Sequence, residues 1–205
     1  NFIFMRQREM LGLGHAILTG QPIIGDEPFA VILADDLCAR TDEDVSKRAL
    51  GQLVEIYEKY NCSVIAIEEV PGDNISSYGV ISGREIEDGL FEVDDMVEKP
   101  KPEDAPSQLG IIGRYVLTPD IFEYIEKTAP GANGEVQITD ALRLMAQDRL
   151  VLAVKFKGRR FDCGSVEGFV EATNFYYESS SCVIYTGAHF LLLTMLACGG
   201  LWFFL

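Results

Sequence analysis

Two adjacent carboxylates, Asp35 and Asp36, directly follow the apolar run FAVILA at residues 29–34. A continuous apolar run of this length is typical of a strand covered on both faces in a parallel sheet. Ligands of open α/β sheets bind beyond the carboxyl ends of the strands, which is where these side chains would lie. A carboxylate there can hold Mg²⁺, whose octahedron is completed by water and by phosphate oxygens of a substrate. The alternative interpretation is a solvated loop that leads to the next helix.

Three other segments carry groups that suit a phosphorylated ligand. The sequence GLG at residues 12–14 precedes a helical pattern, so its backbone N–H groups could approach a nucleotide, although a plain turn has the same composition. Glu98 and Lys99 follow a strand-like segment and offer an acceptor for sugar hydroxyls and a point charge for phosphate, unless they simply end an exposed hairpin. Gly79 either brings the backbone close to a ligand or marks a bulge in a strand.

A compact basic cluster stands out in this acidic chain, because four of its 17 basic residues lie within KFKGRR at residues 155–160. Asp162 follows directly after the next residue. This combination of charges would suit a phosphate-bearing ligand together with a metal ion. The alternative is a charged sheet edge that resists aggregation.

The elements that must position these groups alternate in type along the chain. A helix with the capping sequence TDED at residues 41–44 and an end at Asn61 separates the strand at 29–34 from a second buried strand at 63–67. Such a strand–helix–strand succession predicts a βαβ unit with a right-handed crossover. A later helix is expected to open with Thr118 as N-cap and Pro119 as its first residue. Further strands are expected at 78–82, 90–97, 109–117 and 150–156, and further helices at 139–147 and 166–177. The predicted class is α/β with a mixed sheet.

Length and composition limit the classes of protein to which the chain can belong. Its 205 residues, 48% hydrophobic and 24% charged, suit one globular domain of ordinary size. The net charge of −15 argues against a nucleic-acid partner bound by phosphate neutralisation. Five widely spaced cysteines without a C-x-x-C pair argue against a disulfide framework or a zinc site, and they favour a reducing, cytoplasmic location.

The charge is confined to the first part of the chain, because residues 179–205 contain no Asp, Glu, Lys or Arg. We therefore expect a domain at residues 1–178 and an uncharged tail at 179–205. The apolar part of the tail, residues 183–205, is long enough to span a bilayer, but it lacks flanking Lys or Arg. A buried C-terminal helix and a segment read out of frame are the other two interpretations of this tail.

Seven segments, in order and at their spacing, closely resemble the bacterial UTP–glucose-1-phosphate uridylyltransferases. They run between Arg6 and Glu178 and read GLGHA, FAVILADD, YGVISG, VEKPKPEDAPS, IIGRYVLTPDIF, GANGEVQITDAL and KGRRFDCGSVEGFVEA. The resemblance implies a Rossmann-like nucleotidyltransferase α/β/α sandwich with a mixed sheet. It also implies a Mg²⁺-dependent reaction in which UTP and glucose 1-phosphate give UDP-glucose and pyrophosphate. A phosphate oxygen of the sugar would attack the α-phosphorus of UTP in line, without a protein nucleophile.

The same resemblance assigns metal and nucleotide contacts. Asp35 matches the metal-binding residue at the strand end, with Asp36 as its neighbour, and it counts as a catalytic and nucleotide-binding residue as well. Asp162 matches a second carboxylate on the metal side. Gly14 matches a position that contacts the uridine portion of the nucleotide.

Sugar contacts follow from the same motifs. Gly79 and Glu98 match positions that contact glucose. Lys99 matches the residue that meets the sugar phosphate, and with Asp35 it is the predicted catalytic pair.

Both ends depart from the family pattern. A G-x-G-T-R loop and a P-K-E-M-type segment would precede Asn1, so we expect an N-terminally truncated fragment whose parent enzyme is a homo-oligomer. Three alternatives stay open: a fragment that binds ligand without turnover, a module anchored in a membrane by its tail, and a thymidylyltransferase that uses dTTP. The chain alone is expected to show no turnover.

Overall fold

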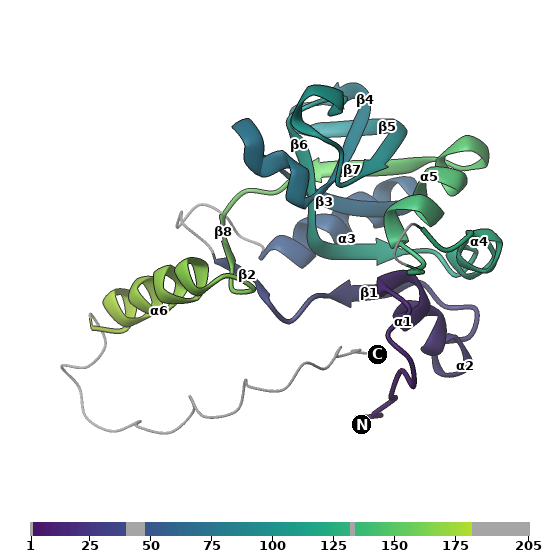
Figure 1. Ribbon diagram of the computed structural model, residues 1–205, viewed down its shortest axis with the longest axis horizontal. Helices are drawn as coiled ribbons and strands as arrows, with labels where there is room; N and C mark the ends of the chain where they lie inside the picture. The colour runs from purple at the N-terminus through teal and green to yellow at the C-terminus, as the bar shows by residue number, and fades with distance from the viewer. Residues whose placement is uncertain (1, 40–47, 132–133, 182–205) are drawn as a thin grey trace.

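The computed structural model describes residues 2–39, 48–131 and 134–181 (Figure 1). Its strands are β1 (Phe29–Ile32), β2 (Asp36–Ala39), β3 (Ser63–Glu69), β4 (Gly79–Glu87), β5 (Leu90–Glu98), β6 (Leu109–Leu117), β7 (Val151–Lys155) and β8 (Arg159–Asp162). Its helices are α1 (Leu13–Thr19), α2 (Gln21–Ile24), α3 (Ala49–Tyr60), α4 (Ile121–Lys127), α5 (Ile138–Asp148) and α6 (Val166–Ser181). Short 3₁₀ helices lie at Gly72–Ser77 and Pro102–Asp104. Six strands form one mixed sheet in the order β1-β6-β3-β7-β5-β4, while β2 and β8 pair separately.

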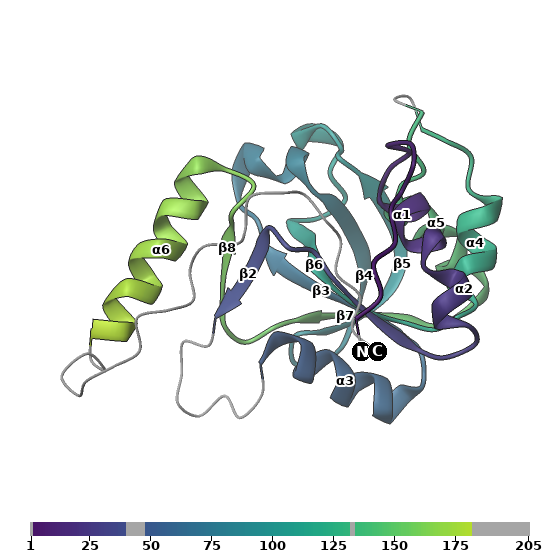
Figure 2. The same ribbon diagram turned by 90° about the horizontal axis from the view of Figure 1, so that it is seen from below.

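Helices cover both faces of the large sheet. Strand β3 shows why, since its residues alternate between two apolar cores. Ile65 and Ile67 pack with α1, α4 and α5 on one face, whereas Val64 and Ala66 pack with Leu53 of α3 on the other. Figure 2 shows α3 on one side of the sheet and α1, α4 and α5 on the other. The predicted three-layer α/β/α sandwich with a mixed sheet is therefore confirmed.

The first strand differs from its prediction. Among the described residues, β1 pairs only with β6, and that pairing is antiparallel, so β1 is an edge strand of the sheet in this part of the chain. Strand β6 lies between β1 and β3 and runs antiparallel to both, and the parallel ladder is formed by β3 with β7. A short apolar run indicates burial but does not give the direction of the neighbouring strand.

Helix boundaries follow the sequence signals unevenly. Asn61 is the C-cap of α3 in the left-handed region, at φ 51°, as predicted. The predicted capping sequence at 41–44 falls outside the described residues. Helix α4 begins at Ile121, later than predicted, because Thr118 and Pro119 form a turn that precedes it. In this turn the Thr118 hydroxyl donates to the Asp120 carboxylate, and the amides of Ile121 and Phe122 donate to the carbonyls of Thr118 and Pro119.

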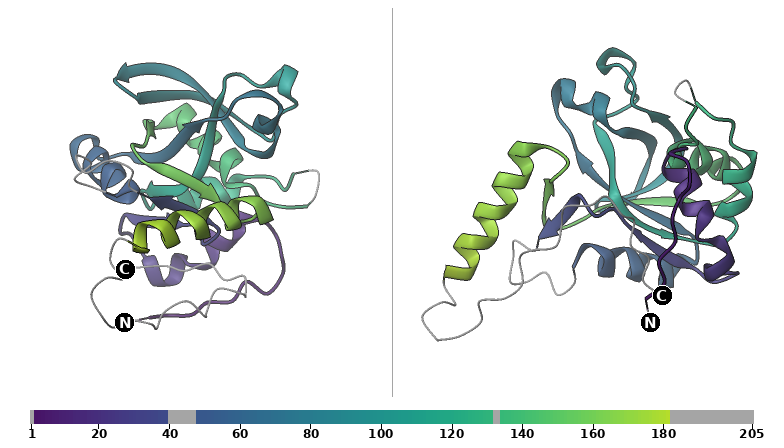
Figure 3. Two further views of the ribbon diagram at one scale, coloured as in Figure 1. Left: turned by 90° about the vertical axis from the view of Figure 1, so that its left-hand side faces the viewer. Right: turned by 60° about the horizontal axis from the view of Figure 1, so that its bottom comes forward.

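The small sheet connects the body of the molecule to its last helix. Strands β2 and β8 are antiparallel and place Asp36 opposite Asp162. Helix α6 packs on β8 through Ala172 and Phe175 and projects away from the large sheet (Figure 3). Within residues 2–39, 48–131 and 134–181, no helix combines the length and the apolar character needed to cross a membrane. The three interpretations of the tail concern residues 183–205, which lie outside the described residues.

Candidate active site

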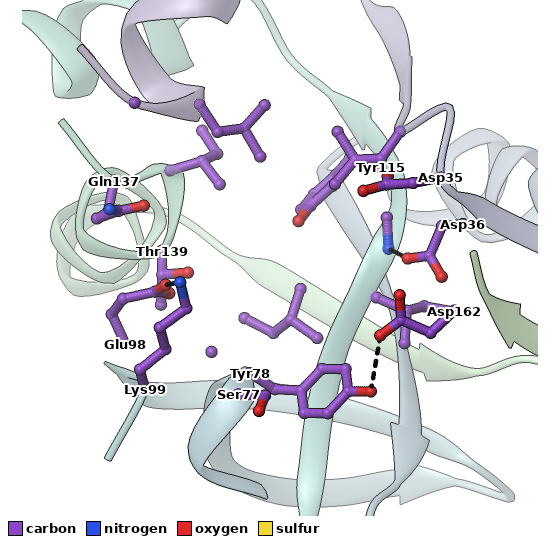
Figure 4. Close-up of a pocket in the computed structure, with 18 of the residues that line it drawn as sticks. Asp35, Asp36, Ser77, Tyr78, Glu98, Lys99, Tyr115, Gln137, Thr139 and Asp162 are labelled. Atoms are coloured by element: carbon purple, nitrogen blue, oxygen red, sulfur yellow. Dashed lines mark hydrogen bonds and ion pairs between the residues drawn. The ribbon is translucent and has the colours of Figure 1, made fainter. Parts of the chain in front are cut away.

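A polar pocket of about 460 Å³ lies at one end of the large sheet (Figure 4). Strand ends, the turn before α1 and the N-terminus of α5 contribute its walls. Five of the residues that the sequence singled out line it together: Asp35, Gly79, Glu98, Lys99 and Asp162. Asp35 and Asp162 lie on one side, and Glu98 and Lys99 lie on the opposite side. The position of the pocket agrees with the rule that ligands of α/β sheets bind beyond strand ends.

Gly14 is not among the lining residues, although its neighbours Gly12 and Leu13 are. The amide of Gly14 donates to the carbonyl of Val136 at 2.9 Å, and a Cβ at Gly14 would lie 2.8 Å from that oxygen. Gly14 therefore allows the turn to pack closely on Val136. Of the two glycines in this turn, Gly12, at φ 91°, is the one that lines the pocket.

The adjacent carboxylates Asp35 and Asp36 differ in burial and in hydrogen bonding. Asp36 is buried, and its Oδ2 accepts a 2.6 Å hydrogen bond from the Gly113 amide while its Oδ1 accepts from Nε of Arg160. Asp35 is exposed to the pocket. Both oxygens of Asp36 are thus hydrogen-bonded within the protein, whereas the exposed carboxylate of Asp35 is open to a ligand in the pocket.

One oxygen of Asp35 and one of Asp162 lie near a common point beside Gly164. A Cβ built on Gly164 would lie 3.5 Å from Oδ2 of Asp35 and 3.1 Å from Oδ1 of Asp162. The described residues contain no group of three or more His, Cys, Asp or Glu side chains placed to hold a metal. Two carboxylates completed by phosphate oxygens and water are nevertheless the donor set that Mg²⁺ takes in phosphoryl-transfer sites, so the residues fit this ion.

Two arginine side chains, each 8% exposed, fix the wall that carries Asp35 and Asp162. The Arg114 guanidinium donates to the carbonyls of Leu33 at 3.1 Å and Gly113 at 2.7 Å, and also to that of Asp36. These bonds lock the turn on which Asp35 sits. Burial alone would lower the pKa of Arg160, but the carboxylate and hydrogen bond of Asp36 raise it, so Arg160 stays charged.

The opposite wall combines the Glu98 carboxylate and the Lys99 amine with the space that Gly79 leaves. A Cβ on Gly79 would lie 2.7 Å from Oγ1 of Thr139 and 3.1 Å from Oε2 of Glu98, so only glycine leaves room between these oxygens. Lys99 is held at φ 45°, and its amide donates to the Tyr78 carbonyl at 3.0 Å. Its Nζ lies 3.9 Å from Oε1 of Glu98. Hydroxyl acceptors beside a cation suit a sugar that carries phosphate.

Sequence reasoning missed several polar groups of the pocket, chiefly the side chains of Tyr78, Tyr115 and Thr139. Burial raises the pKa of Tyr115, which keeps its phenol neutral. Each of these residues lies next to or within a motif already quoted, such as YGVISG or IIGRYVL. The motifs therefore located these residues in the chain but did not show that their side chains point into the pocket.

The basic cluster turns mostly to the protein's own acids. Nζ of Lys155 lies 2.8 Å from Oε2 of Glu69, and Nη2 of Arg159 lies 3.6 Å from Oε2 of Glu171. Of these basic residues only Arg160 lines the pocket. The expectation that this cluster as a whole faces a phosphate-bearing ligand is wrong, because nearby carboxylates on β3 and α6 neutralise it.

The three cysteines within the described residues carry free thiols. Burial raises the pKa of Cys38 and of Cys62 to about 11. Burial, helped by Asp162, also raises the pKa of Cys163. A thiol with a raised pKa is a poor nucleophile at neutral pH, so these residues offer no covalent chemistry.

The chain belongs to the nucleotidyl transferase family, whose profile matches residues 1–179 and so includes every wall of the pocket. It is similar to a UTP–glucose-1-phosphate uridylyltransferase of Pseudomonas aeruginosa, with 62% identity over 178 residues that make up 87% of this chain and 63% of that protein.

Two solved structures agree with this assignment. A UDP-glucose pyrophosphorylase in complex with UDP-glucose has a TM-score of 0.82 and 57% identity, and the match covers 86% of this chain and 66% of that one. A UTP-bound enzyme of the same type from Acinetobacter baumannii has a TM-score of 0.73 and 30% identity, with 88% and 64% of the two chains covered. The resemblance inferred from the seven motifs is confirmed. The chain spans a little under two thirds of the length of the Pseudomonas relative.

Proposed function

We propose that this chain forms the metal- and sugar-phosphate-binding part of a UTP–glucose-1-phosphate uridylyltransferase, which makes UDP-glucose and pyrophosphate. The observation that carries the proposal is the opposition of Asp35 and Asp162 to Glu98 and Lys99 across one pocket. A nucleotide and a sugar phosphate need such a division between a cation end and a hydroxyl-reading end. The names of the relatives with the same fold, one with bound UDP-glucose and one with bound UTP, support the substrates.

The residues act by position and charge. Glu98 accepts hydrogen bonds from glucose hydroxyls, and Gly79 lets the sugar lie against the strand. Lys99 neutralises the sugar phosphate whose oxygen attacks the α-phosphorus of UTP in line with the departing pyrophosphate. Asp35 and Asp162 would hold Mg²⁺, which when bound offsets the negative charge of the phosphates. The protein supplies no covalent intermediate.

The proposal is tested with the protein that the complete reading frame of this chain encodes. The measurement is pyrophosphate release from UTP and glucose 1-phosphate. We expect Mg²⁺-dependent release with UTP and at most slow release with dTTP. Faster turnover with dTTP would make the protein a thymidylyltransferase instead. Absence of product with either nucleotide would overturn the proposal.

Gly79→Ala is expected to raise the KM for glucose 1-phosphate by about tenfold or more, because a Cβ would enter the space between Thr139 and Glu98 and overpacking costs about 1–3 kcal/mol. Steady-state kinetics with varied sugar phosphate measure the effect. Gly131→Ala is the matched control, since among the described residues a Cβ there meets only the Glu135 carbonyl, at 3.6 Å. An unchanged KM in Gly79→Ala would show that sugar does not lie against this strand.

A cytoplasmic location and a homo-oligomeric state belong to the same proposal. The free thiols at Cys38, Cys62 and Cys163 suit a reducing compartment. Helix α6 exposes Val166 and Phe169, by 77% and 56%, and apolar surface of this kind is typical of an interface between subunits. Light scattering of the purified enzyme measures the oligomeric state, and a monomer at micromolar concentration would contradict it.

A further inference from the structure

Arg160 is the centre of a buried ion-pair network beside the pocket. Its side chain is only 8% exposed, and its Nε donates to Oδ1 of Asp36. Its Nη1 lies 2.6 Å from Oε1 of Glu68 and 2.9 Å from the hydroxyl oxygen of Tyr78. Its Nη2 lies 3.5 Å from Oδ2 of Asp162. One guanidinium thus connects β8 with β2, β3 and the residue before β4.

The chemistry of the guanidinium dictates the direction of the Tyr78 proton. Arginine can only donate hydrogen bonds, so the Tyr78 oxygen must accept the one it shares with Arg160. The phenol proton is then free to point at Oδ2 of Asp162, 3.5 Å away (Figure 4). Arg160 therefore sets Tyr78 as a donor toward this carboxylate.

The two oxygens of Asp162 are made unequal by these neighbours. Both Tyr78 and Arg160 lie at Oδ2, each at 3.5 Å. Oδ1 accepts from the Gly164 amide at 3.1 Å and faces the point beside Gly164 that Oδ2 of Asp35 also faces. A ligand between the two aspartates would meet Asp162 through Oδ1.

We propose that Arg160 and Tyr78 are positioning residues that hold Asp162 by Oδ2, so that it presents a single oxygen, Oδ1, to a divalent cation shared with Asp35. The proposal rests on the proposed function for the presence of that cation. It adds that Arg160 holds the Asp36 carboxylate in an ion pair, so that Asp35 is the carboxylate that shares the cation with Asp162. Partners that orient a metal ligand in this way change metal affinity by about 10–100-fold when removed.

Binding of Mn²⁺ alone to the 205-residue chain tests the proposal without catalysis. The electron paramagnetic resonance signal of free Mn²⁺ gives the Kd during a titration. Tyr78→Phe keeps the ring but removes the donor to Asp162, and we expect its Kd to rise by about tenfold. Arg160→Lys is expected to do the same, because an ammonium cannot reach the partners of all three guanidinium nitrogens.

Arg159→Lys is the matched control, since this neighbouring side chain is half exposed and pairs with Glu171. Asp162→Asn is the reference for loss of the site, and thermal unfolding confirms that each variant is folded. If Asp162→Asn weakens Mn²⁺ binding and Tyr78→Phe does not, positioning by Tyr78 is overturned while the metal site stands. If Asp162→Asn binds Mn²⁺ like the wild type, the metal part of the proposed function falls, and the positioning proposal falls with it.

Discussion

A Lys99→Met enzyme is expected to lose about 10²–10³-fold in kcat/KM for glucose 1-phosphate, the range found when one preorganised charge or donor is removed from a transition state. Nothing else on the sugar side of the pocket carries positive charge among the described residues that line it. The left-handed backbone at Lys99, φ 45°, holds the side chain in its place beside Glu98. The loss should appear mainly in kcat, because charge on the reacting phosphates changes most in the transition state.

Steady-state kinetics of the complete reading frame, with UTP saturating, measure this effect. Lys101→Met is the matched control, because Lys101 is exposed and does not line the pocket. Unfolding by urea should be nearly unchanged in both variants, since both side chains are exposed. A Lys99→Met enzyme with wild-type kcat/KM would remove Lys99 from the reaction.

Asp35→Asn and Asp36→Asn are expected to fail in opposite ways, although the two residues are neighbours. Asp36→Asn breaks a buried pair with Arg160 and should lower the free energy of unfolding by about 3–5 kcal/mol. Asp35→Asn removes a pocket carboxylate without a buried partner, so stability should stay within about 0.5 kcal/mol of the wild type. Its activity should instead fall by two orders of magnitude or more, on the order of the loss of one electrostatic group.

Urea unfolding of the 205-residue chain gives the stabilities, and pyrophosphate release by the complete reading frame gives the activities. Excess Mg²⁺ should partly restore Asp35→Asn, because a weakened site still fills at high concentration. Asp35→Asn with full activity at low Mg²⁺ would exclude this residue from metal binding. An Asp36→Asn chain as stable as the wild type would show that its pair with Arg160 contributes nothing.

Elements of the large sheet were predictable because each has a local signal. The apolar run at 63–67 marks β3, and left-handed Asn61 marks the end of α3. The small β2–β8 sheet had no such signal, since DLCA and RRFD are only four residues long and do not alternate between polar and apolar residues. What makes them strands is a pairing between segments whose members Asp36 and Arg160 are 124 residues apart in the sequence.

The sequence predicted where the site residues lie, but not which side chains they contact. Asp35, Glu98 and Lys99 are at strand ends, where a strand-end rule places ligand contacts, and all three line the pocket. Which acid a basic residue meets depends on distant chain segments, so Arg160 gave no sign that it would be buried against Asp36. The contact between Arg160 and Asp36 forms only when the strands that carry them pair.

The junction between Asp162 and α6 is tightly packed. Gly168, in the first turn of α6, is so close to Asp162 that a Cβ there would lie 1.9 Å from the Asp162 carbonyl oxygen. The first turn of α6 is therefore packed directly against the backbone of the residue that carries this carboxylate. An alanine at position 168 would force α6 or the Asp162 backbone to shift, so glycine at this position keeps the helix and the strand end that carries the carboxylate in their present places.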